Sequence, residues 1–511
     1  RLLILDNLIR RFNNIKMLKN NIIKTHIYLT VFVSGAVVLV LELLGTRIIA
    51  PYYGTTVYVW ASLIGVALVG LAAGYSLGGF LSDRRNDSVF MYLFILIGAV
   101  LIILIPLILR PVLNVSEIFG ARFGSLFAAF ILFFGIFVAL GSVAPYAVKI
   151  TADDFRHLGL TAGSLYAVST IGGFAGAIAA GYFLIPALGI GHIINICGGL
   201  LAVMGITGMF LKKKNKTPAL MLIIIFVMLQ FMFSTAAESG APERISVLYE
   251  KSGNYGKIYV IDRAGRYRYM VVDGAVQTYI DKNDDTFASG YINMLYDAAK
   301  WHEKPEKALV IGLGGGSLGR LLENHGVETL NIDINPEIVK AAQRYFGFEG
   351  EYEISDGRRF LRRTNEKYDM IFFDVFNGYS VYPFMFSKES FELAKKRLNK
   401  NGILAMNIVG TVPGENGQKN RFDRSLRDIN ETLESVFENV HTRMHETGGL
   451  ASYVFYASER PFENRYKKII ISEKGNIITD DHNPLDYNLT GLVEKWREYN
   501  YKDFLKELPL I

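Results

Sequence analysis

The chain has 511 residues, of which 51% are apolar and 20% are charged, and its formal net charge is +6. It is too apolar for an ordinary soluble enzyme, and its second half is too charged for a pure transporter. The basic residues cluster beside apolar segments, so they indicate membrane topology and not a nucleic-acid surface. The single cysteine, Cys197, excludes an intrachain disulfide and a cysteine-based metal site.

The composition changes along the chain, and we divide it accordingly. A basic N-terminal segment (1–26) precedes a transmembrane domain of about seven helices (27–236), since each apolar segment has the ~20 residues needed to cross a bilayer. A small antiparallel β region (237–284) then leads into an α/β domain (285–511). The expected spans lie near 27–44, 57–81, 89–109, 123–147, 162–188, 190–211 and 219–236.

Lysine and arginine are concentrated in alternate loops of the membrane half. They precede the first expected span and follow the second, fourth and sixth. Cytoplasmic loops carry such an excess, so we expect a multi-pass cell-membrane protein with its N-terminus in the cytoplasm. Seven spans then place the second half of the chain outside. A re-entrant segment would place it inside, so the sequence leaves the side of the second half open.

The second half alternates between strand-like and helix-like segments. Residues 245–281 alternate as antiparallel strands, and 285–302 form a linking helix. Helix-length segments then separate successive apolar strands, which predicts a Rossmann-like, doubly wound parallel sheet. The expected strands are 308–312, 329–333, 352–355, 368–375 and 402–408, and the expected helices are 317–325, 336–346, 357–364 and 387–399.

A glycine-rich loop follows the first of these strands. Gly312, Gly314 and Gly316 allow a sharp turn and a close approach to a ligand. A helix beginning near Ser317 would point its free N–H groups at that ligand. The next strand ends at Asp333, about 20 residues further on, where a carboxylate can hold ribose hydroxyls. The unit therefore predicts nucleoside binding, although the glycine spacing also fits a dinucleotide fold.

Acidic residues also end the third and fourth strands. Asp356 precedes Gly357 after the third strand, and Asp374 ends the fourth. Ligands bind such sheets at the carboxyl ends of the strands, and buried charges are costly unless they are used or paired. The acids therefore predict a binding site at one rim. Asp356 alone can also be a simple helix N-cap.

Seven stretches carry a family resemblance: YEKSGNYGKIYV, VDGAVQTY, VIGLGGGSLGR, IDINPEIV, SDGRRFL, YDMIFFD and, late in the chain, ITDDHNPLDY. Together they resemble the spermidine synthases, or polyamine aminopropyltransferases. More narrowly, they resemble bacterial and archaeal membrane proteins that fuse a multi-span half to a spermidine-synthase-like domain. The resemblance implies the fold of S-adenosylmethionine-dependent methyltransferases for the second half.

The resemblance also implies a reaction. An aminopropyl group would pass from decarboxylated S-adenosylmethionine, or methyl from S-adenosylmethionine, to an amine. Asp374 would be the catalytic base, and Tyr379, Tyr382 and Asn377 would lie on a loop closing over the acceptor. The sulfonium is already an activated leaving group, so no metal is expected. The implied cofactor-binding residues are Gln277, Gly312, Gly314, Gly316, Asp333, Asp356 and Gly357.

The chain departs from the family pattern on the acceptor side. Asn377 and Gly378 replace an Asp and a Pro, Gly256 replaces a Gln, and the linking helix carries Tyr291-Ile292-Asn293. Each lost charge-assisted hydrogen bond to a diamine is worth about 1.5–3 kcal/mol. The sequence therefore favours a membrane-linked amine or another polyamine over free putrescine. The expected partners are the lipid bilayer and this amine acceptor, with a homodimer as an option and no nucleic acid.

Two alternatives remain at this point. The domain can be an S-adenosylmethionine-dependent methyltransferase, which a basic residue near the sulfonium tail would favour. It can also be a nucleoside-binding regulator of a transporter. In that case Glu42, inside the first expected span, would line a polar cavity. The alternative explanation for a carboxylate in this position is an ion pair with Arg47 that only stabilises the helix.

Overall fold

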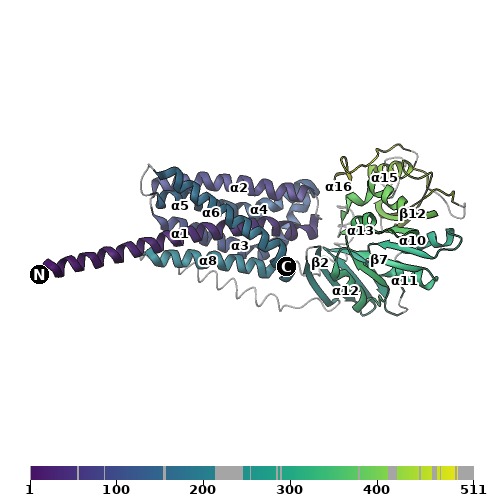
Figure 1. Cartoon of the computed structure of the whole chain (residues 1–511), viewed down its shortest axis with the longest axis horizontal. Helices are drawn as coiled ribbons and strands as arrows, with labels where there is room; N and C mark the ends of the chain where they lie inside the picture. The colour runs from purple at the N-terminus through teal and green to yellow at the C-terminus, as the bar shows by residue number, and fades with distance from the viewer. Residues whose placement is uncertain are drawn as a thin grey trace. The chain divides into compact units, whose positions relative to one another are not determined.

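The chain divides into two compact units, one built on long apolar helices and the other on strands with shorter helices. We describe each unit by itself in this computed structural model (Figure 1). The residues that it describes are 2–53, 57–85, 87–152, 157–212, 245–253, 255–283, 286–287, 290–377, 380–412, 423–447, 450–462, 469–471, 473–489 and 492.

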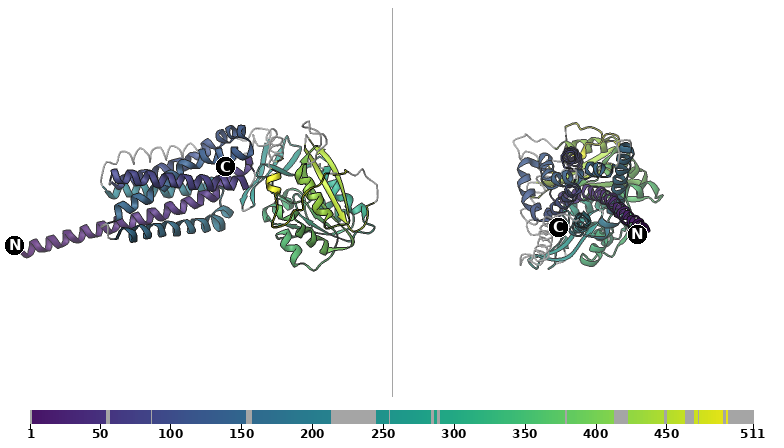
Figure 2. Two further views of the ribbon diagram at one scale, coloured as in Figure 1. Left: turned by 90° about the horizontal axis from the view of Figure 1, so that it is seen from above. Right: turned by 90° about the vertical axis from the view of Figure 1, so that its left-hand side faces the viewer.

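The first unit is a bundle of long helices (Figure 2). Six of its described helical segments are long and apolar enough to cross a membrane, and they coincide with the first six expected spans. The seventh, 219–236, lies outside the described residues and stays a prediction. The helices are α1 (Leu2–Tyr53), α2 (Val57–Arg84), α3 (Ser88–Ser116), α4 (Gly120–Gly141), α5 (Val143–Thr151), α6 (Leu158–Ile178), α7 (Ile185–Ala187) and α8 (Ile190–Lys212), with a 3₁₀ turn η1 (Glu117–Phe119) and a π-helical stretch η3 (Ala179–Leu184).

Glycines allow the closest helix contacts in this unit. A Cβ on Gly74 or Gly78 of α2 would collide with backbone atoms at the end of α4 and the start of α5. Gly172 and Gly176 of α6 stand against the backbone of α1 in the same way. Small residues at helix interfaces are the usual means of close packing in lipid. These glycines therefore have a packing role.

The second unit begins with a five-stranded antiparallel meander. Its first four strands lie within 245–281, as the alternating pattern predicted, whereas Thr286–Phe287 form the fifth strand and were wrongly predicted to begin the linking helix. Its strands lie in chain order, with β1 paired to β2 and so on to β5. Alternate residues of β2 and β3 pack against α12 of the following fold, so the meander is fixed to it through a shared apolar core. The strands are β1 (Ile245–Gly253), β2 (Gly256–Arg263), β3 (Tyr267–Val272), β4 (Ala275–Asp281) and β5 (Thr286–Phe287).

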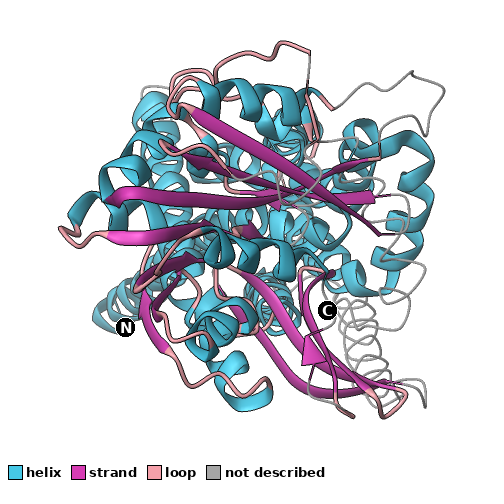
Figure 3. Cartoon of the chain, turned by 90° about the vertical axis from the view of Figure 1, so that its right-hand side faces the viewer, coloured by secondary structure: helices cyan, strands magenta, loops and turns pink. Residues whose placement is uncertain are grey.

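A seven-stranded sheet forms the centre of this unit, in the order β13-β14-β12-β9-β6-β7-β8 (Figure 3). The five strands from β12 to β8 are parallel, as predicted, and each lies within a few residues of its expected position. Two antiparallel strands, β13 and β14, extend the sheet beyond β12, and the sequence analysis did not predict them. The strands are β6 (Lys307–Ile311), β7 (Glu328–Asp333), β8 (Glu351–Ile354), β9 (Tyr368–Phe373), β12 (Leu398–Thr411), β13 (Asn439–Thr447) and β14 (Leu450–Ser458).

Helices cover both faces of the sheet, because each buried strand presents alternate apolar side chains to opposite sides. Leu309 and Phe373 pack with α13, α14 and α15, whereas Val310 and Phe372 pack with α10 and α11. The helices are α10 (Gly290–Trp301), α11 (Ser317–Asn324), α12 (Pro336–Tyr345), α13 (Gly357–Arg363), α14 (Lys388–Arg397), α15 (Arg424–Glu434) and α16 (Leu485–Asn488).

The strand order creates one crevice at the carboxyl end of the sheet. The parallel strands leave β6 in opposite directions, through β7 to β8 on one side and through β9 to β12 on the other. Such a reversal between neighbouring strands is where open α/β sheets bind ligands. At this point Gly312 lies directly against the carbonyl of Asp374, and the Asp374 N–H donates to the Ile311 carbonyl at 2.9 Å.

Candidate active site

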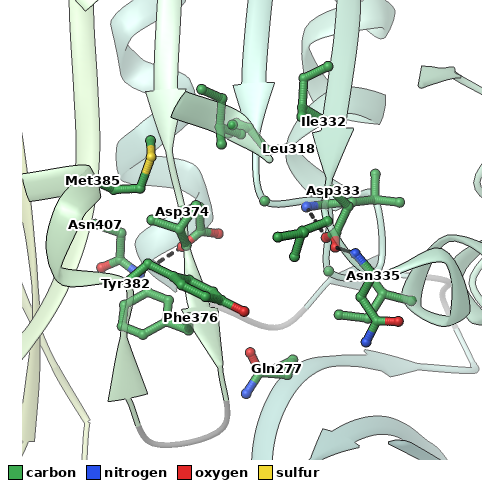
Figure 4. Close-up of a pocket in the computed structure, with 18 of the residues that line it drawn as sticks. Gln277, Leu318, Ile332, Asp333, Asn335, Asp374, Phe376, Tyr382, Met385 and Asn407 are labelled. Carbon is green, nitrogen blue, oxygen red and sulfur yellow. Dashed lines mark hydrogen bonds between the residues drawn. The ribbon is translucent and has the colours of Figure 1, made fainter. Parts of the chain in front are cut away.

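A cavity of about 650 Å³ lies at this crevice, within the second unit (Figure 4). Side chains from the meander, from the loops after β6, β7, β8 and β9, and from β12, β13 and β14 line it. The predicted residues Gln277, Gly312, Gly314, Asp333, Asp356, Gly357, Asp374 and Tyr382 are all among them. The acids that the sequence placed at one rim therefore surround a single cavity.

The glycine loop takes the expected form. Gly312, Gly314 and Gly316 all have positive φ, which glycine adopts without strain. Gly316 precedes α11 in a left-handed conformation without a side-chain cap, so the first N–H groups of α11 receive no capping side chain. Gly316 itself does not line the cavity, because it stands against the ring of Phe348.

A contact between the meander and the glycine loop places Gln277. The neighbouring Thr278 Oγ1 accepts a hydrogen bond of 3.0 Å from the Gly315 N–H. A threonine in β4 therefore fixes this strand to the loop and brings Gln277 to the cavity. The sequence analysis singled out Gln277 but not Thr278.

Asp333 lies at the end of β7 with only 8% of its surface exposed. The Leu313 N–H donates to its Oδ2 at 3.0 Å, and the Asn335 N–H donates to its Oδ1 at 2.8 Å. Burial raises the pKa of this carboxyl to about 6, and the backbone hydrogen bonds oppose that shift. Asp333 thus holds the start of the glycine loop against β7 while it faces the cavity (Figure 4).

Asp356 is both an N-cap and a cavity residue. Its carboxylate accepts a 2.7 Å hydrogen bond from the Arg359 N–H at the start of α13, so Asp356 is the helix N-cap that its position before Gly357 suggested. It lines the cavity as well, beside Gly357. A side chain at Gly357 would collide with Ile311 of β6, so glycine allows α13 to begin close to the sheet.

Two side chains from separate elements hold Asp374. Tyr291 of α10 donates its hydroxyl hydrogen to Oδ2 at 3.2 Å. Asn407 of β12 donates from Nδ2 to Oδ1 at 3.1 Å, and Figure 4 shows this second hydrogen bond. Burial raises the pKa of Asp374 to about 6, and both hydrogen bonds oppose the shift. Burial also raises the pKa of Tyr291, next to the Asp374 carboxylate. The carboxylate is therefore fixed in orientation and ionised near neutral pH.

The loop after β9 forms a short hairpin, β10 (Phe376–Asn377) and β11 (Ser380–Val381). Tyr382 follows it, and its ring lies beside Asp374 and Phe376 in the cavity (Figure 4). Asn377 lies in β10, although its side chain is outside the description, and Tyr379 lies outside the described residues. The predicted loop is therefore at the site, and its aromatic residues Phe376 and Tyr382 line the cavity.

Some residues of the cavity were not predicted as site residues. Asn407 and Tyr291 hold Asp374, while His445 of β13 and Arg358 and Asp480 line other parts of the wall. Tyr291 and the motif that contains Asp480 were visible in the sequence, but no rule of spacing joined them to Asp374. His445 belongs to the antiparallel strands that were missed altogether.

The second unit also matches proteins that are already known. Residues 289–441 match the family model described as "Spermine/spermidine synthase domain". This region is therefore similar to that domain family, which confirms the resemblance expected from the sequence motifs. We name the second unit the synthase domain for this likeness.

Individual relatives cover part of the chain. The polyamine aminopropyltransferase of Vibrio vulnificus is 32% identical over 27% of this chain and 49% of its own length. That of Thermococcus onnurineus is 26% identical over 40% of this chain and 72% of its own. The chain thus spans about half of the first relative's length. Spermidine synthase from Thermotoga maritima aligns in structure over 50% of this chain and 88% of its own, with 18% identity and a TM-score of 0.34.

Proposed function

We propose that the synthase domain transfers an aminopropyl group from decarboxylated S-adenosylmethionine to an amine acceptor. The observation that carries this proposal is the fixed carboxylate of Asp374, which Tyr291 and Asn407 hold at the crevice between β6 and β9. The family match of residues 289–441 and the polyamine aminopropyltransferase names of the relatives support the same reaction.

The reaction needs positioning and a proton acceptor, and not a strong electrophilic catalyst. The amine nitrogen attacks the carbon beside the sulfonium, the carbon–sulfur bond breaks, and neutral methylthioadenosine leaves. The proton of the new ammonium passes to Asp374. A base with a pKa of about 6 is ionised at neutral pH and accepts that proton. Holding the reactants in line supplies most of the remaining rate enhancement.

The donor would lie over the glycine loop. Asp333 and Gln277 would hold the ribose, and Asp356 with Gly357 would border the adenine. Both oxygens of Asp333 already accept backbone hydrogen bonds, and a carboxylate has lone pairs for ribose hydroxyls as well. Its burial means that each such bond is protected from water.

The acceptor would approach past Tyr382, where Phe376 and Met385 also line the cavity. The membrane half supports a tethered enzyme, since six of its described helices are apolar enough to span a bilayer. We therefore propose a membrane-anchored enzyme, with a membrane-linked amine or a polyamine as its acceptor.

Ligand titration tests the donor. The detergent-solubilised full chain would be titrated with decarboxylated S-adenosylmethionine, S-adenosylmethionine and methylthioadenosine, and its melting temperature measured. A ligand that binds only the folded state raises the melting temperature by mass action. We expect the decarboxylated donor to stabilise more than S-adenosylmethionine. The opposite order would identify a methyltransferase instead.

Substitution of Asp374 tests the reaction. Asp374→Asn keeps the size of the side chain and removes the base, so release of methylthioadenosine in the presence of an amine should fall by about 100-fold or more. Binding of methylthioadenosine itself should persist. Undiminished transfer by Asp374→Asn would exclude Asp374 as the base.

A further inference from the structure

We propose that Asp480, in the late ITDDHNPLDY motif, is a positioning residue of the active site. It acts through Arg358, which follows Gly357 directly at the start of α13. Both Asp480 and Arg358 line the cavity. The inference rests on the proposed function, because it assigns this ion pair the task of fixing the donor edge of the same site.

The contact between these two side chains is bidentate. Arg358 donates from Nη1 to Oδ1 of Asp480 at 2.7 Å and from Nη2 to Oδ2 at 2.6 Å. The arginine is only 8% exposed, and the hydrogen bond from it lowers the pKa of Asp480. Two parallel hydrogen bonds fix the guanidinium plane and not only its distance. The first turn of α13, with Asp356 and Gly357, is thereby held in one orientation.

Asp480 also contacts a second segment of the cavity wall. Ser387 donates its hydroxyl hydrogen to Oδ1 of Asp480 at 2.7 Å, and the Asp480 N–H donates to Glu389 at 3.0 Å. Both residues belong to the start of α14, directly after the 3₁₀ turn η4 (Pro383–Phe386). That turn carries Phe384 and Met385 into the cavity wall.

Two further hydrogen bonds bring η4 into this network. Arg358 Nη1 donates to the carbonyl of Phe384 at 3.1 Å, and Asn483 Nδ2 donates to the carbonyl of Pro383 at 2.8 Å. The motif therefore links the donor edge to the wall beside Asp374 through one hydrogen-bonded network, in which Arg358 is buried and Asp480 is partly exposed. Removing the carboxylate leaves the Arg358 cation buried without this partner, so α13 and η4 must shift to solvate it.

The test uses the full chain and four variants: Asp480→Asn, Arg358→Gln, the two combined, and Asp481→Asn. Asp481 is the matched control, because it is the next residue of the motif and is exposed. The measurements are the Kd of methylthioadenosine by calorimetry, the KM for the donor, kcat and the melting temperature. The Kd needs no turnover, so it separates this inference from the proposed transfer reaction.

We expect Asp480→Asn to raise both the Kd and the donor KM about tenfold, with a smaller effect on kcat. Arg358→Gln should do the same, and the double variant should be no worse than either single one, because the two residues act as a unit. Asp481→Asn should match the wild type. A lower melting temperature with unchanged Kd and KM would reduce the pair to a structural role and overturn the inference. A wild-type chain that binds no methylthioadenosine would overturn the proposed function and the inference together.

Discussion

Two carboxyls with the same raised pKa have different surroundings at this site. Asp333 is held by backbone N–H groups of the glycine loop, whereas Asp374 is held by side chains from α10 and β12. Because backbone N–H groups hold Asp333, its orientation depends only on the folding of the glycine loop. Because two side chains hold Asp374, its orientation depends on those individual residues. Substitutions therefore affect the two acids differently.

Tyr291 is one of the residues on which Asp374 depends, through its hydroxyl group. Its hydrogen bond lowers the pKa of Asp374 against the effect of burial, so Tyr291→Phe should raise that pKa above about 6. The acid limb of the kcat profile should then move to higher pH, and kcat at neutral pH should fall about tenfold. Tyr296→Phe is the control, since Tyr296 lies on the same helix and bonds to His325. An unchanged pH profile in Tyr291→Phe would mean that the hydroxyl does not tune the base.

Asp333 predicts a pH dependence of binding. Its carboxyl has a pKa of about 6 in the folded chain, so it is ionised above that pH and protonated below it. Ribose hydroxyls donate more strongly to the ionised form. Methylthioadenosine affinity should therefore fall as the pH drops from 7.5 through about 6, approaching a tenfold loss per unit. Asp333→Asn should bind weakly with no such slope, and a wild-type affinity that does not change with pH would contradict the role of Asp333.

At the scale of elements, the glycine loop depends on a close contact between neighbouring strand ends. Gly312 has φ +97° and lies against the Asp374 carbonyl, so Gly312→Ala adds backbone strain and a collision. We expect it to destabilise the domain by about 3 kcal/mol or more. Gly265→Ala is the control, because Gly265 has φ +68° in open space, and its cost should be about 1 kcal/mol. Equal unfolding midpoints in urea for the two variants would show that the collision is relieved.

The sequence predicted the parallel strands because short strand-like runs alternate with helix-length segments, and the clearest of these runs are fully apolar. Ala308 to Ile311 and Met370 to Phe373 are of this kind. It did not predict β13 and β14, because β14 is buried along almost its whole length and shows no alternation, and because polar residues such as His441 and Arg443 interrupt the pattern of β13. The acids could be predicted because strand ends share one rim. Asn407 could not, because its role depends on β12 lying next to β9, which only the pairing establishes.

The late motif shows the same limit over a longer distance. Asp480 and Arg358 are 122 positions apart in sequence, and a pattern of letters gives no distance between them. The sequence identified the motif as a family feature but did not explain why it contains acidic residues. The ion pair with Arg358 explains Asp480, because the chain returns after β14 and contacts α13 and η4 at the cavity.

At the scale of the whole molecule, the positive-inside pattern makes a consistent prediction about the helix bundle. The ends of the second and fourth spans should share one side, and Asp83 at the end of α2 forms an ion pair of 3.0 Å with Lys149 near the end of α5. Ile118, between the third and fourth expected spans, is 80% exposed, and the same pattern predicts that it lies on the opposite side. This topology stays a prediction.

Cysteine labelling of intact cells tests this topology, after Cys197→Ala removes the native thiol. An impermeant reagent should label Ile118→Cys and not Asp83→Cys, because the N-terminus is expected in the cytoplasm. Labelling of Asp83→Cys alone would invert the topology. Ile477 is 42% exposed in the synthase domain, and seven spans, an odd number, predict that Ile477→Cys is labelled together with Ile118→Cys. An Ile477→Cys that is protected like Asp83→Cys would mean that 219–236 does not span, and that the donor is used on the side of the membrane where it is made.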